Sequence, residues 1–349
     1  MRLLLIGGTG FIGPFVAAEL ERLGHDVFTF HRARTHAAPG RREIFGDRRR
    51  LADSAAELRA LAPDVVIDLI LSSGAQARDV MNVFRGAVGR IVALSSGDVY
   101  RACGVLHGFE PGPLQPVPLT ESSELRTTPQ TYPAAQIKAL QQVFGWLDDE
   151  YDKIPVEREI LGDPALPGTV LRLPMVYGSG DFAHRFHPIV KRIVDRRPII
   201  LLEEKQAAWR APRGYVENVA AAIALAATSD RAAGRTYNVS EPDSPTELEW
   251  ATEIGGLMAW TGEIVVLPPD RMPAHLRMPA NFDQHWVYDT TRIREELGYR
   301  EPVARQDAMR RTIEWERANP PTTFNPHPFD YAAEDAALSE NEGRRATSA

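Results

Sequence analysis

Three glycines near the N-terminus have the spacing of a turn that binds phosphate. Gly7, Gly10 and Gly13 follow an apolar run, and a helical pattern begins among them. Gly7 permits the tight turn after the strand, Gly10 lets backbone N–H groups approach a pyrophosphate, and Gly13 lets the helix pack closely on the sheet. The helix N-terminus, at Phe11 and Ile12, adds unpaired amides and a dipole that favour negative charge. The turn predicts a dinucleotide cradle, although small residues also serve ordinary strand-to-helix turns.

The elements around this turn support the interpretation. An amphipathic helix is expected from Phe11 to Leu23, and Gly24 is a natural C-cap for it. Short apolar runs then alternate with helical segments, which predicts right-handed crossovers and a parallel sheet buried on both faces. The expected strands are Leu3–Ile6, Val27–Phe30, Glu43–Phe45, Val65–Leu69, Arg90–Leu94 and Thr169–Leu173. The predicted fold class is α/β, a Rossmann-type doubly wound parallel sheet.

A second, smaller α/β lobe is expected where the regular alternation weakens, after Leu173. Before it, residues 100–134 are rich in Pro, Gly, Ser and Thr, which predicts a long surface loop at the carboxyl edge of the sheet. In the lobe, Ser244-Pro245-Thr246-Glu247 is typical of a capping box, so a helix should run from there to about Met258. Further helices are expected at Pro188–Asp195, Val216–Ala227, Thr291–Leu297 and Arg305–Ala318, and further strands at Ile199–Leu202, Thr236–Val239 and Ile264–Val266.

These patterns suggest three regions. Residues 1–175 and 214–242 form the predicted dinucleotide-binding domain, and residues 176–213 and 243–320 form the predicted substrate lobe. Residues 321–349 are a polar tail that is expected to fray, with Phe324, Phe329 and Tyr331 as its anchors.

Composition excludes several classes of protein. The net charge of −7, with acidic and basic residues interspersed, gives no concentrated positive field for nucleic acid. Cys103 is the only cysteine, which rules out an intramolecular disulfide and a cysteine-based zinc site. No apolar run approaches the roughly 20 residues of a membrane-spanning helix, and the N-terminus has no signal-peptide pattern. We expect no membrane partner and a location in the reducing cytoplasm.

Several separated motifs give the chain a wider resemblance. They are Gly7-Gly8-Thr9-Gly10-Phe11-Ile12-Gly13, Gly46-Asp47, Asp64-Val65-Val66-Ile67, Leu94-Ser95-Ser96-Gly97-Asp98-Val99-Tyr100, Leu171-Arg172-Leu173-Pro174-Met175-Val176-Tyr177-Gly178, Gly214-Tyr215-Val216-Glu217-Asn218-Val219-Ala220 and Tyr288-Asp289-Thr290-Thr291-Arg292-Ile293 with Glu296-Leu297-Gly298-Tyr299. In order and spacing they resemble the extended short-chain dehydrogenase/reductase family, also called the NAD-dependent epimerase/dehydratase family, over roughly residues 1 to 318. The resemblance implies a nicotinamide cofactor and a homodimer.

The end of the second expected strand favours one cofactor. A carboxylate there would bind the adenosine ribose and repel a 2′-phosphate, but this chain has Arg32 and Arg34 instead. Guanidinium groups bind phosphate bidentately, so NADP is predicted, with NAD as the alternative. The two arginines could also be solvated turn residues. By resemblance, Asp47 binds the adenine amino group, although Gly-Asp alone is equally a turn.

The resemblance also implies catalytic roles. Ser96, just past the fifth strand, matches the family's hydroxyl that polarises the substrate oxygen; a turn cap is its structural alternative. The family's Tyr-x-x-x-Lys pair is absent, because Asp149 stands where the tyrosine is expected before Lys153 and Glu157. Residues two apart on a helix point about 200° apart, so Tyr151 and Lys153 could converge only if Tyr151 precedes the helix.

Pro155 makes that start plausible, because proline is tolerated in the first turn of a helix. We therefore assign Lys153 to the cofactor and Tyr151 to proton transfer. Tyr132 is the rival phenol, and Asp98 beside Ser96 is a candidate acid or base that would face substrate.

Three further sets of residues complete the predicted site. Pro174 follows the sixth strand, where the family's backbone flanks the nicotinamide carboxamide. Arg210 and Arg213 lie near the position of a diphosphate-binding arginine in relatives that use sugar nucleotides, but neither aligns without an offset. His184 and His187 with Asp181 are expected to line a polar pocket rather than bind a metal, and no metal is predicted.

These assignments lead to two hypotheses. The first is an NAD(P)-dependent oxidoreductase or epimerase that acts by hydride transfer on a hydroxyl-bearing, sugar-like small molecule, either free or nucleotide-linked. The second is an atypical member that binds the dinucleotide without dehydrogenase chemistry, as a sensor or an RNA-associated protein. The missing Tyr-x-x-x-Lys pair is the main support for the second hypothesis.

Overall fold

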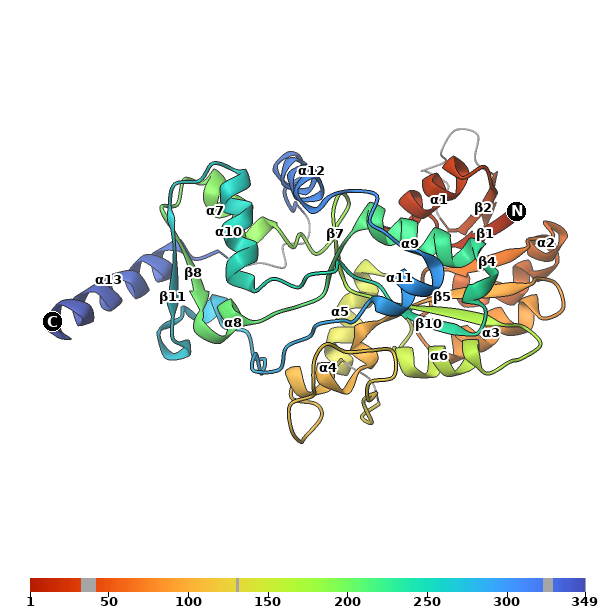
Figure 1. Ribbon diagram of the computed structural model, residues 1–349, viewed down its shortest axis with the longest axis horizontal. Coiled ribbons are helices and arrows are strands. Elements are labelled where there is room, and N and C mark those ends of the chain that lie inside the picture. The colour runs from red at the N-terminus through yellow and green to blue at the C-terminus, as the bar shows by residue number, and fades with distance from the viewer. Residues whose placement is uncertain (33–41, 130–131, 323–328, 349) are drawn as a thin grey trace.

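A parallel sheet forms the main body of the protein (Figure 1). The computed structural model describes residues 1–32, 42–129, 132–322 and 329–348. The seven strands of the sheet, in spatial order, are β10 (Arg235–Asn238), β6 (Gly168–Leu173), β5 (Arg90–Ser96), β4 (Val65–Asp68), β1 (Arg2–Ile6), β2 (Asp26–His31) and β3 (Arg42–Phe45). All neighbouring pairs are parallel. The strand order reverses between β1 and β4, which is where doubly wound sheets bind ligands. The predicted fold class is confirmed.

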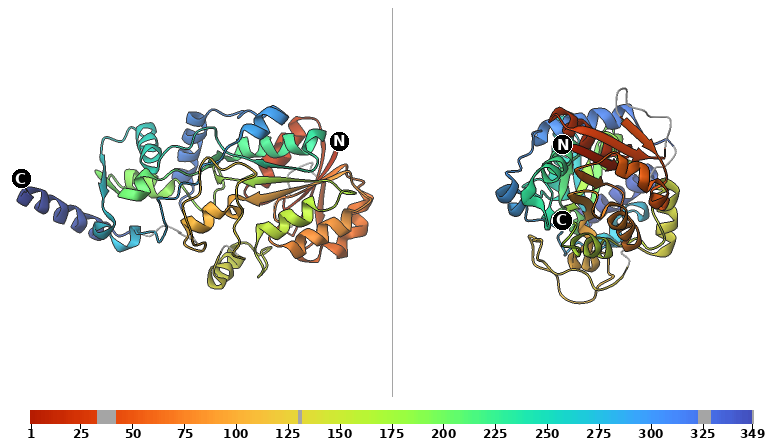
Figure 2. Two further views of the ribbon diagram at one scale, coloured as in Figure 1. Left: turned by 60° about the horizontal axis from the view of Figure 1, so that its bottom comes forward. Right: turned by 90° about the vertical axis from the view of Figure 1, so that its right-hand side faces the viewer.

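Helices cover both faces of this sheet (Figure 2). Helices α1 (Gly13–Arg22) and α9 (Val216–Thr228) lie on one face, and α3 (Gly74–Phe84) and α6 (Lys153–Leu161) lie on the other. From Leu3 to Ile6 the side chains of β1 alternate between the two layers and are fully buried in both. A strand that is buried on both sides must be apolar throughout, which is why the N-terminal run has no polar alternation.

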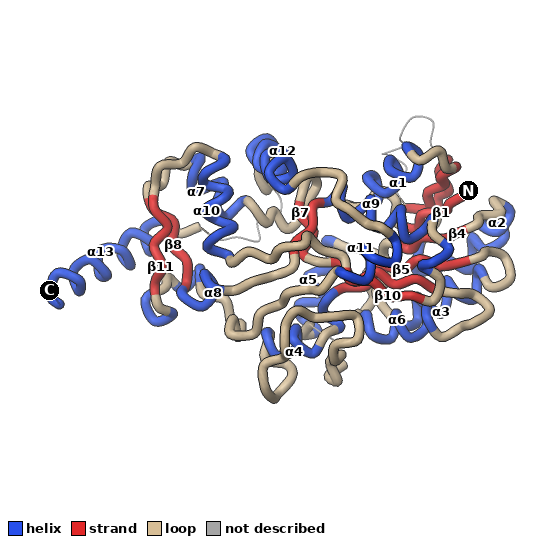
Figure 3. Tube along the Cα trace, viewed as in Figure 1, coloured by secondary structure: helices blue, strands red, loops and turns tan. Residues whose placement is uncertain are grey.

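The second lobe is built from smaller pieces (Figure 3). It contains the parallel pair β8 (Ile199–Glu203) with β11 (Glu263–Leu267). A second parallel pair, β7 (Met175–Tyr177) with β9 (Arg213–Tyr215), stands at the predicted boundaries between the two regions. The helices of the lobe are α7 (His187–Val194), α8 (Glu204–Ala208), α10 (Glu247–Leu257) and α12 (Arg305–Ala318). The predicted capping box was placed two residues too early: Thr246 is the N-cap of α10 and is paired with Glu249, whereas Ser244 lies outside the helix.

The remaining helices include three that the sequence did not predict. Helix α2 (Ala55–Ala60) packs against α3, and α11 (Thr291–Leu297) ends at Gly298 in the left-handed conformation, as predicted. The unpredicted helices are α4 (Arg101–Leu106), α5 (Ala134–Val143) and α13 (Tyr331–Ser348). In the part of the chain that the structure describes, no helix is both long and apolar enough to span a membrane.

Helix α13 extends away from the second lobe, in the region predicted to fray (Figure 1). Two of the three predicted anchors are in place: Phe329 packs beside His187, and Tyr331 lies under Arg197. Phe324 lies outside the described residues. The anchor that the sequence did not reveal is Glu334, whose buried carboxylate forms an ion pair with Arg192 at 2.5 Å and contacts His275 at 3.1 Å.

Candidate functional site

The glycine turn joins β1 to α1 as the sequence predicted. Gly7 has a φ of +87° and donates its N–H to Phe30 O at 3.0 Å, and Gly10 donates to Gly7 O at 3.2 Å. A Cβ on Gly13 would lie 2.5 Å from the carbonyl carbon of Gly8, so only glycine allows this close packing. A Cβ on Gly10 would instead meet a single atom, Gly7 O at 3.6 Å. Gly10 therefore borders open space, which fits a passing ligand.

The start of α1 has the character of an anion site. Ile12 is the N-cap residue and gives no side-chain cap, and the first turn contains Pro14. Amides at such an uncapped N-terminus need other acceptors, which phosphate oxygens provide. Phe11 is half-buried, and a Cβ on Gly180 would lie 3.4 Å from its ring. The cradle therefore fits a dinucleotide, and the place of its pyrophosphate at Gly10 to Gly13 stays a prediction.

The predicted adenosine end holds Arg32 and Asp47. Arg32 is exposed after β2 and donates to Gly145 O at 3.3 Å. Asp47 caps the short helix Arg48–Ser54 by accepting the Arg49 N–H at 3.0 Å, and the two side chains form an ion pair at 2.8 Å. Hydrogen bonding to Arg49 lowers the pKa of the Asp47 carboxyl. Asp47 thus has the turn role as well, and its contact with adenine stays a prediction. Arg34 lies outside the described residues.

Four of the predicted residues converge at the carboxyl end of β5. Ser96 ends the strand, and its Oγ accepts the N–H of Asp98 at 3.3 Å. Tyr151 donates its hydroxyl to Asp98 Oδ2 at 2.9 Å. Lys153 donates to Leu71 O and, at 3.2 Å, to Leu94 O, and its Nζ lies 5.7 Å from the centre of the Tyr151 ring.

The start of α6 explains this convergence. Asp152 is the N-cap and accepts the Ile154 N–H at 3.0 Å, so Lys153 is the first helical residue. Tyr151 therefore precedes the helix, and Pro155 stands in its first turn, where no intrahelical hydrogen bond is lost. Tyr151 thus meets the condition that the sequence set for its approach to Lys153, and the roles of both residues stay predictions.

The rival phenol is close to the same point. The rings of Tyr132 and Tyr151 lie 5.6 Å apart between centroids. Burial raises the pKa of both phenols, and the Asp98 carboxylate adds to the rise in each case. Both tyrosines are therefore neutral at physiological pH, unlike a phenol that is poised to lose its proton.

Electrostatics make Asp98 the unusual group of the site. Its side chain is 1% exposed, and burial raises the pKa of its carboxyl against the opposing charges of Arg126 and Lys153. Burial likewise lowers the pKa of Lys153, although the nearby carboxylates of Asp98 and Asp68 oppose the change. Asp98 Oδ1 has no hydrogen-bond partner among the described residues. A buried carboxylate with one oxygen on a phenol and one free can exchange a proton.

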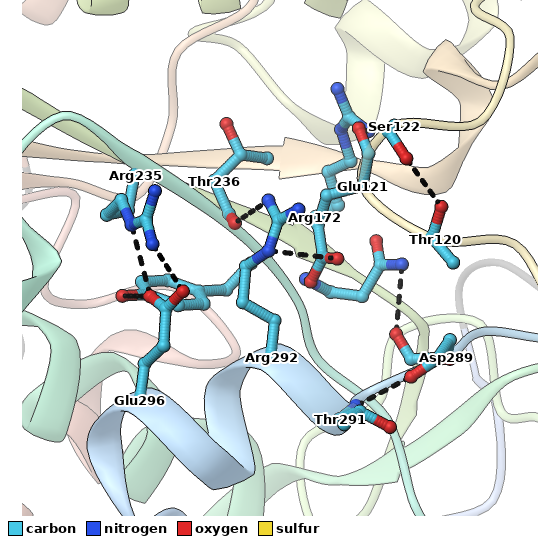
Figure 4. Close-up of polar contacts among 12 residues, drawn as sticks. Thr120, Glu121, Ser122, Arg172, Arg235, Thr236, Asp289, Thr291, Arg292 and Glu296 are labelled. Carbon is cyan, nitrogen blue, oxygen red and sulfur yellow. Dashed lines mark hydrogen bonds and ion pairs between the residues drawn. The ribbon is translucent and has the colours of Figure 1, made fainter.

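A buried ionic network behind the site fixes α6 to the sheet. Glu157 accepts a bidentate pair of hydrogen bonds from Arg172 at 3.0 and 2.7 Å, and a third from Ser95 at 2.6 Å. Arg172 also donates to Glu121 O at 3.0 Å. Figure 4 shows the outer part of this network, where Arg292 lies 3.5 Å from the Glu121 carboxylate. The sequence pattern drew attention to Glu157 by its spacing from Lys153, but it did not predict the contact with Arg172.

Aromatic residues of the C-terminal segment cover the turn after β5. A Cβ on Gly97 would lie 1.4 Å from Tyr288 Oη and 2.7 Å from the Trp286 ring, so this position admits only glycine. Tyr288 donates to Leu173 O at 3.3 Å. Local sequence gave no sign of this packing, because Gly97 and Tyr288 are far apart in the chain.

The predicted substrate residues do not all gather at Ser96. Arg210 is exposed and donates to Ser244 O at 2.9 Å. Arg213 is buried, forms an ion pair with Glu247 and lies 4.4 Å above the Trp250 ring, so it joins β9 to α10. Pro174 stands between β6 and β7, and a Cβ on Gly214 would lie 2.9 Å from its ring. The structure gives these residues packing roles, and their contact with ligands stays a prediction.

The two histidines of the second lobe turn toward α12. His184 Nδ1 lies 2.7 Å from Glu316 Oε2, and its ring stacks on Trp315. His187 Nδ1 lies 4.0 Å from the same carboxylate. Asp181 instead accepts a hydrogen bond from Arg185 at 2.6 Å. These side chains connect the loop after β7 to α12.

Comparisons with known proteins match this architecture. The model described as "NAD dependent epimerase/dehydratase family" matches residues 3–240. A comparison with curated proteins gave no significant sequence match. The chain is similar in structure to a UDP-glucose 4-epimerase from Thermotoga maritima solved with UDP-glucose, with a TM-score of 0.63 and 17% identity over 91% of this chain and 99% of that chain.

Two other solved structures are similar. A dTDP-glucose 4,6-dehydratase from Streptomyces venezuelae, solved with NAD bound, has a TM-score of 0.64 and 22% identity over 91% of this chain and 98% of that chain. A UDP-glucose 4-epimerase from Thermus thermophilus, in complex with NAD, has a TM-score of 0.61 and 21% identity over 91% and 99%. At these identities the likeness shows the fold.

Proposed function

Because the chain belongs to the NAD-dependent epimerase/dehydratase family, we propose that it is an oxidoreductase or epimerase that acts on a sugar-like hydroxyl compound by hydride transfer. The observation that carries this proposal is the hydrogen bond of 2.9 Å between Tyr151 and the buried Asp98, beside Ser96. The solved relatives bind UDP-glucose or carry the names of dTDP-glucose enzymes, which supports a nucleotide-linked sugar as the substrate class.

The proton follows a route through the phenol. In the direction of alcohol oxidation, Tyr151 Oη accepts the proton of the substrate hydroxyl while its own proton passes to Asp98 Oδ2. In the direction of reduction, both transfers reverse. A neutral phenol suits this relay, since it is both donor and acceptor. Ser96 orients the substrate oxygen by hydrogen bonding.

Lys153 and the glycine turn are assigned to the cofactor. Two of the three Lys153 donors bind backbone carbonyls, so the third is available for a hydroxyl of the nicotinamide ribose. When bound, the nicotinamide ring supplies the hydride acceptor or donor. Arg32 favours NADP over NAD by charge, whereas the similar solved structures have NAD bound and support a nicotinamide dinucleotide in general. A homodimer and a cytoplasmic location stay predictions.

The alternative hypothesis predicts binding without turnover. Its main support was the missing Tyr-x-x-x-Lys pair, and the approach of Tyr151 to Lys153 weakens that support. The test is to incubate the protein and NADP or NAD with a panel of UDP- and dTDP-linked hexoses. Nicotinamide absorbance reports hydride transfer, and chromatography identifies the products. If the wild type converts a sugar and Tyr151→Phe does not, the result supports the enzyme hypothesis. Dinucleotide binding without conversion of any sugar supports the sensor instead.

A further inference from the structure

Arg126 is a buried cation that the sequence analysis did not single out. Its side chain is 1% exposed, and its backbone N–H donates to Val99 O at 2.9 Å, directly after the turn that carries Asp98. The residue belongs to the long segment between α4 and α5, which was expected to run over the surface. A guanidinium is buried only where it finds several acceptors, so its contacts indicate what it holds together.

The guanidinium touches both halves of the proposed proton-transfer site. Its Nε donates to the backbone carbonyl of Asp98 at 2.7 Å, and its Nη2 donates to the carboxylate of Asp152 at 2.5 Å. Asp152 is the N-cap of α6 and lies between Tyr151 and Lys153. A single side chain therefore links the turn after β5 to the start of α6.

The segment that carries Arg126 is itself held firmly. The carboxylate of Glu110, 5% exposed, accepts the backbone N–H groups of Thr127 and Thr128, each at 2.5 Å. Arg126 also donates to Thr128 O at 2.6 Å. Contacts within its own loop thus hold the guanidinium in the position from which it contacts Asp98 and Asp152.

We propose that Arg126 is a positioning residue for the proton relay: it fixes the Asp98 turn against the Tyr151–Lys153 turn and so keeps the phenol on the carboxylate. This inference rests on the proposed function of the site. The donor geometry requires a planar fork, because one guanidinium spans a carbonyl on one side and a carboxylate on the other.

Arg126 also acts on Asp98 by charge. Its positive charge opposes the effect of burial on the pKa of the Asp98 carboxyl, while the negative charge of Asp152 adds to that effect. The charged and titratable groups that face Asp98 are Arg126, Asp152, Tyr151, Lys153, Tyr132, Cys103 and Tyr288. Removing Arg126 should raise this pKa, and neutralising Asp152 should lower it.

The test compares Arg126→Met and Arg126→Lys with a matched control, Arg101→Met. Arg101 anchors the same segment through Glu124 at 3.1 Å and Pro111 O at 2.9 Å, and within the described residues its side chain makes no hydrogen bond or ion pair with Asp98 or Asp152. The first readout is the pKa of the Asp98 carboxyl, which is measured by carbon-13 NMR of aspartate-labelled protein. The Asp98 signal is assigned by its loss in Asp98→Asn. The second readout is kcat and its pH profile with the dinucleotide and a converted sugar.

We expect Arg126→Met to raise the pKa of Asp98, to move the acid limb of the kcat profile to higher pH and to lower kcat by ~10²-fold, since small misplacements in a site have that cost. Arg126→Lys should keep the pKa near that of the wild type and recover part of kcat. Asp152→Asn should lower the pKa of Asp98. This variant provides a second test of the charges around Asp98 if Arg126→Met does not fold.

A wild-type Asp98 pKa in Arg126→Met, or a loss of kcat no larger than in Arg101→Met, would overturn the inference. The NMR readout uses the protein alone and needs no turnover. Failure of the wild type to bind a dinucleotide or convert a sugar would therefore refute the proposed function. The effect of Arg126 on the pKa of Asp98 would still be decided by the NMR measurement.

Discussion

Replacing Tyr151 by Phe removes one hydroxyl from the site and leaves the ring in place. In the wild type this hydroxyl makes the hydrogen bond of 2.9 Å to Asp98, and the other Asp98 oxygen has no partner among the described residues. If Tyr151 relays the proton, the variant should lose ~10²–10⁴-fold in kcat, the range measured for general acid–base groups. That loss corresponds to about 3–5 kcal/mol of barrier.

The same variant should have a smaller effect on folding. A hydrogen bond to a charged group contributes about 1.5–3 kcal/mol, and protonation of Asp98 reduces the loss because burial already raises the pKa of this carboxyl. The assay is kcat with a converted sugar nucleotide beside urea unfolding of the same preparation. Dinucleotide affinity should stay near that of the wild type, since the phenol is not assigned to cofactor binding.

Tyr132→Phe is the matched control, because its ring packs 5.6 Å from that of Tyr151. It should keep kcat within a few-fold of the wild type. If Tyr132→Phe is the inactive variant and Tyr151→Phe keeps full activity, the relay is assigned to the wrong phenol.

Three further outcomes follow from the same contacts. Burial raises the pKa of Asp98 in the folded protein above the unfolded value near 3.8, so the contribution of this carboxyl to stability is present at low pH and is lost as pH rises through the folded pKa. Over that rise, Asp98→Asn should gain stability relative to the wild type, and it should lose activity. A difference in urea unfolding between the two proteins that does not depend on pH would contradict this. Glu334→Ala breaks the buried pair with Arg192 and should cost about 3–5 kcal/mol, with faster hydrogen exchange at the start of α13, whereas an unchanged unfolding midpoint would show that the pair contributes nothing. Arg32→Ala should weaken NADPH binding by ~10–100-fold and leave NADH binding nearly unchanged, and an equal loss for both nucleotides would exclude recognition of the 2′-phosphate.

The sheet and the cradle could be predicted because their signals are local. Apolar runs marked every strand of the main sheet, and Gly7 and Gly13 are required by backbone conformation and close packing within a few residues. The meeting of Tyr151 with Lys153 was also predictable, because Pro155 limits where the helix begins.

What the sequence did not reveal depends on contacts between distant segments. Arg126 reaches Asp98 across 28 residues, and Glu334 reaches Arg192 across 142 residues. Neither residue stands in a motif, and a polar sequence such as that of α13 gives no amphipathic signal. Their roles arise from the tertiary fold, which brings buried charges to their partners.

Isothermal titration calorimetry of NADPH and NADH against the wild type and Gly10→Val tests whether the glycine turn binds a dinucleotide. A Cβ at Gly10 would have only one described protein atom within 4 Å, so we expect the variant to fold like the wild type while its methyl groups fill the space assigned to the pyrophosphate. Gly24→Ala, at the end of α1, strains the backbone because Gly24 has a φ of +82°, but its Cβ would have no described atom within 4 Å; it is the control for substitution of a glycine outside the cradle. We expect the wild type and Gly24→Ala to bind at least one nucleotide, and Gly10→Val to bind neither. Undiminished binding in Gly10→Val, or no heat with either nucleotide in the wild type, would contradict this expectation.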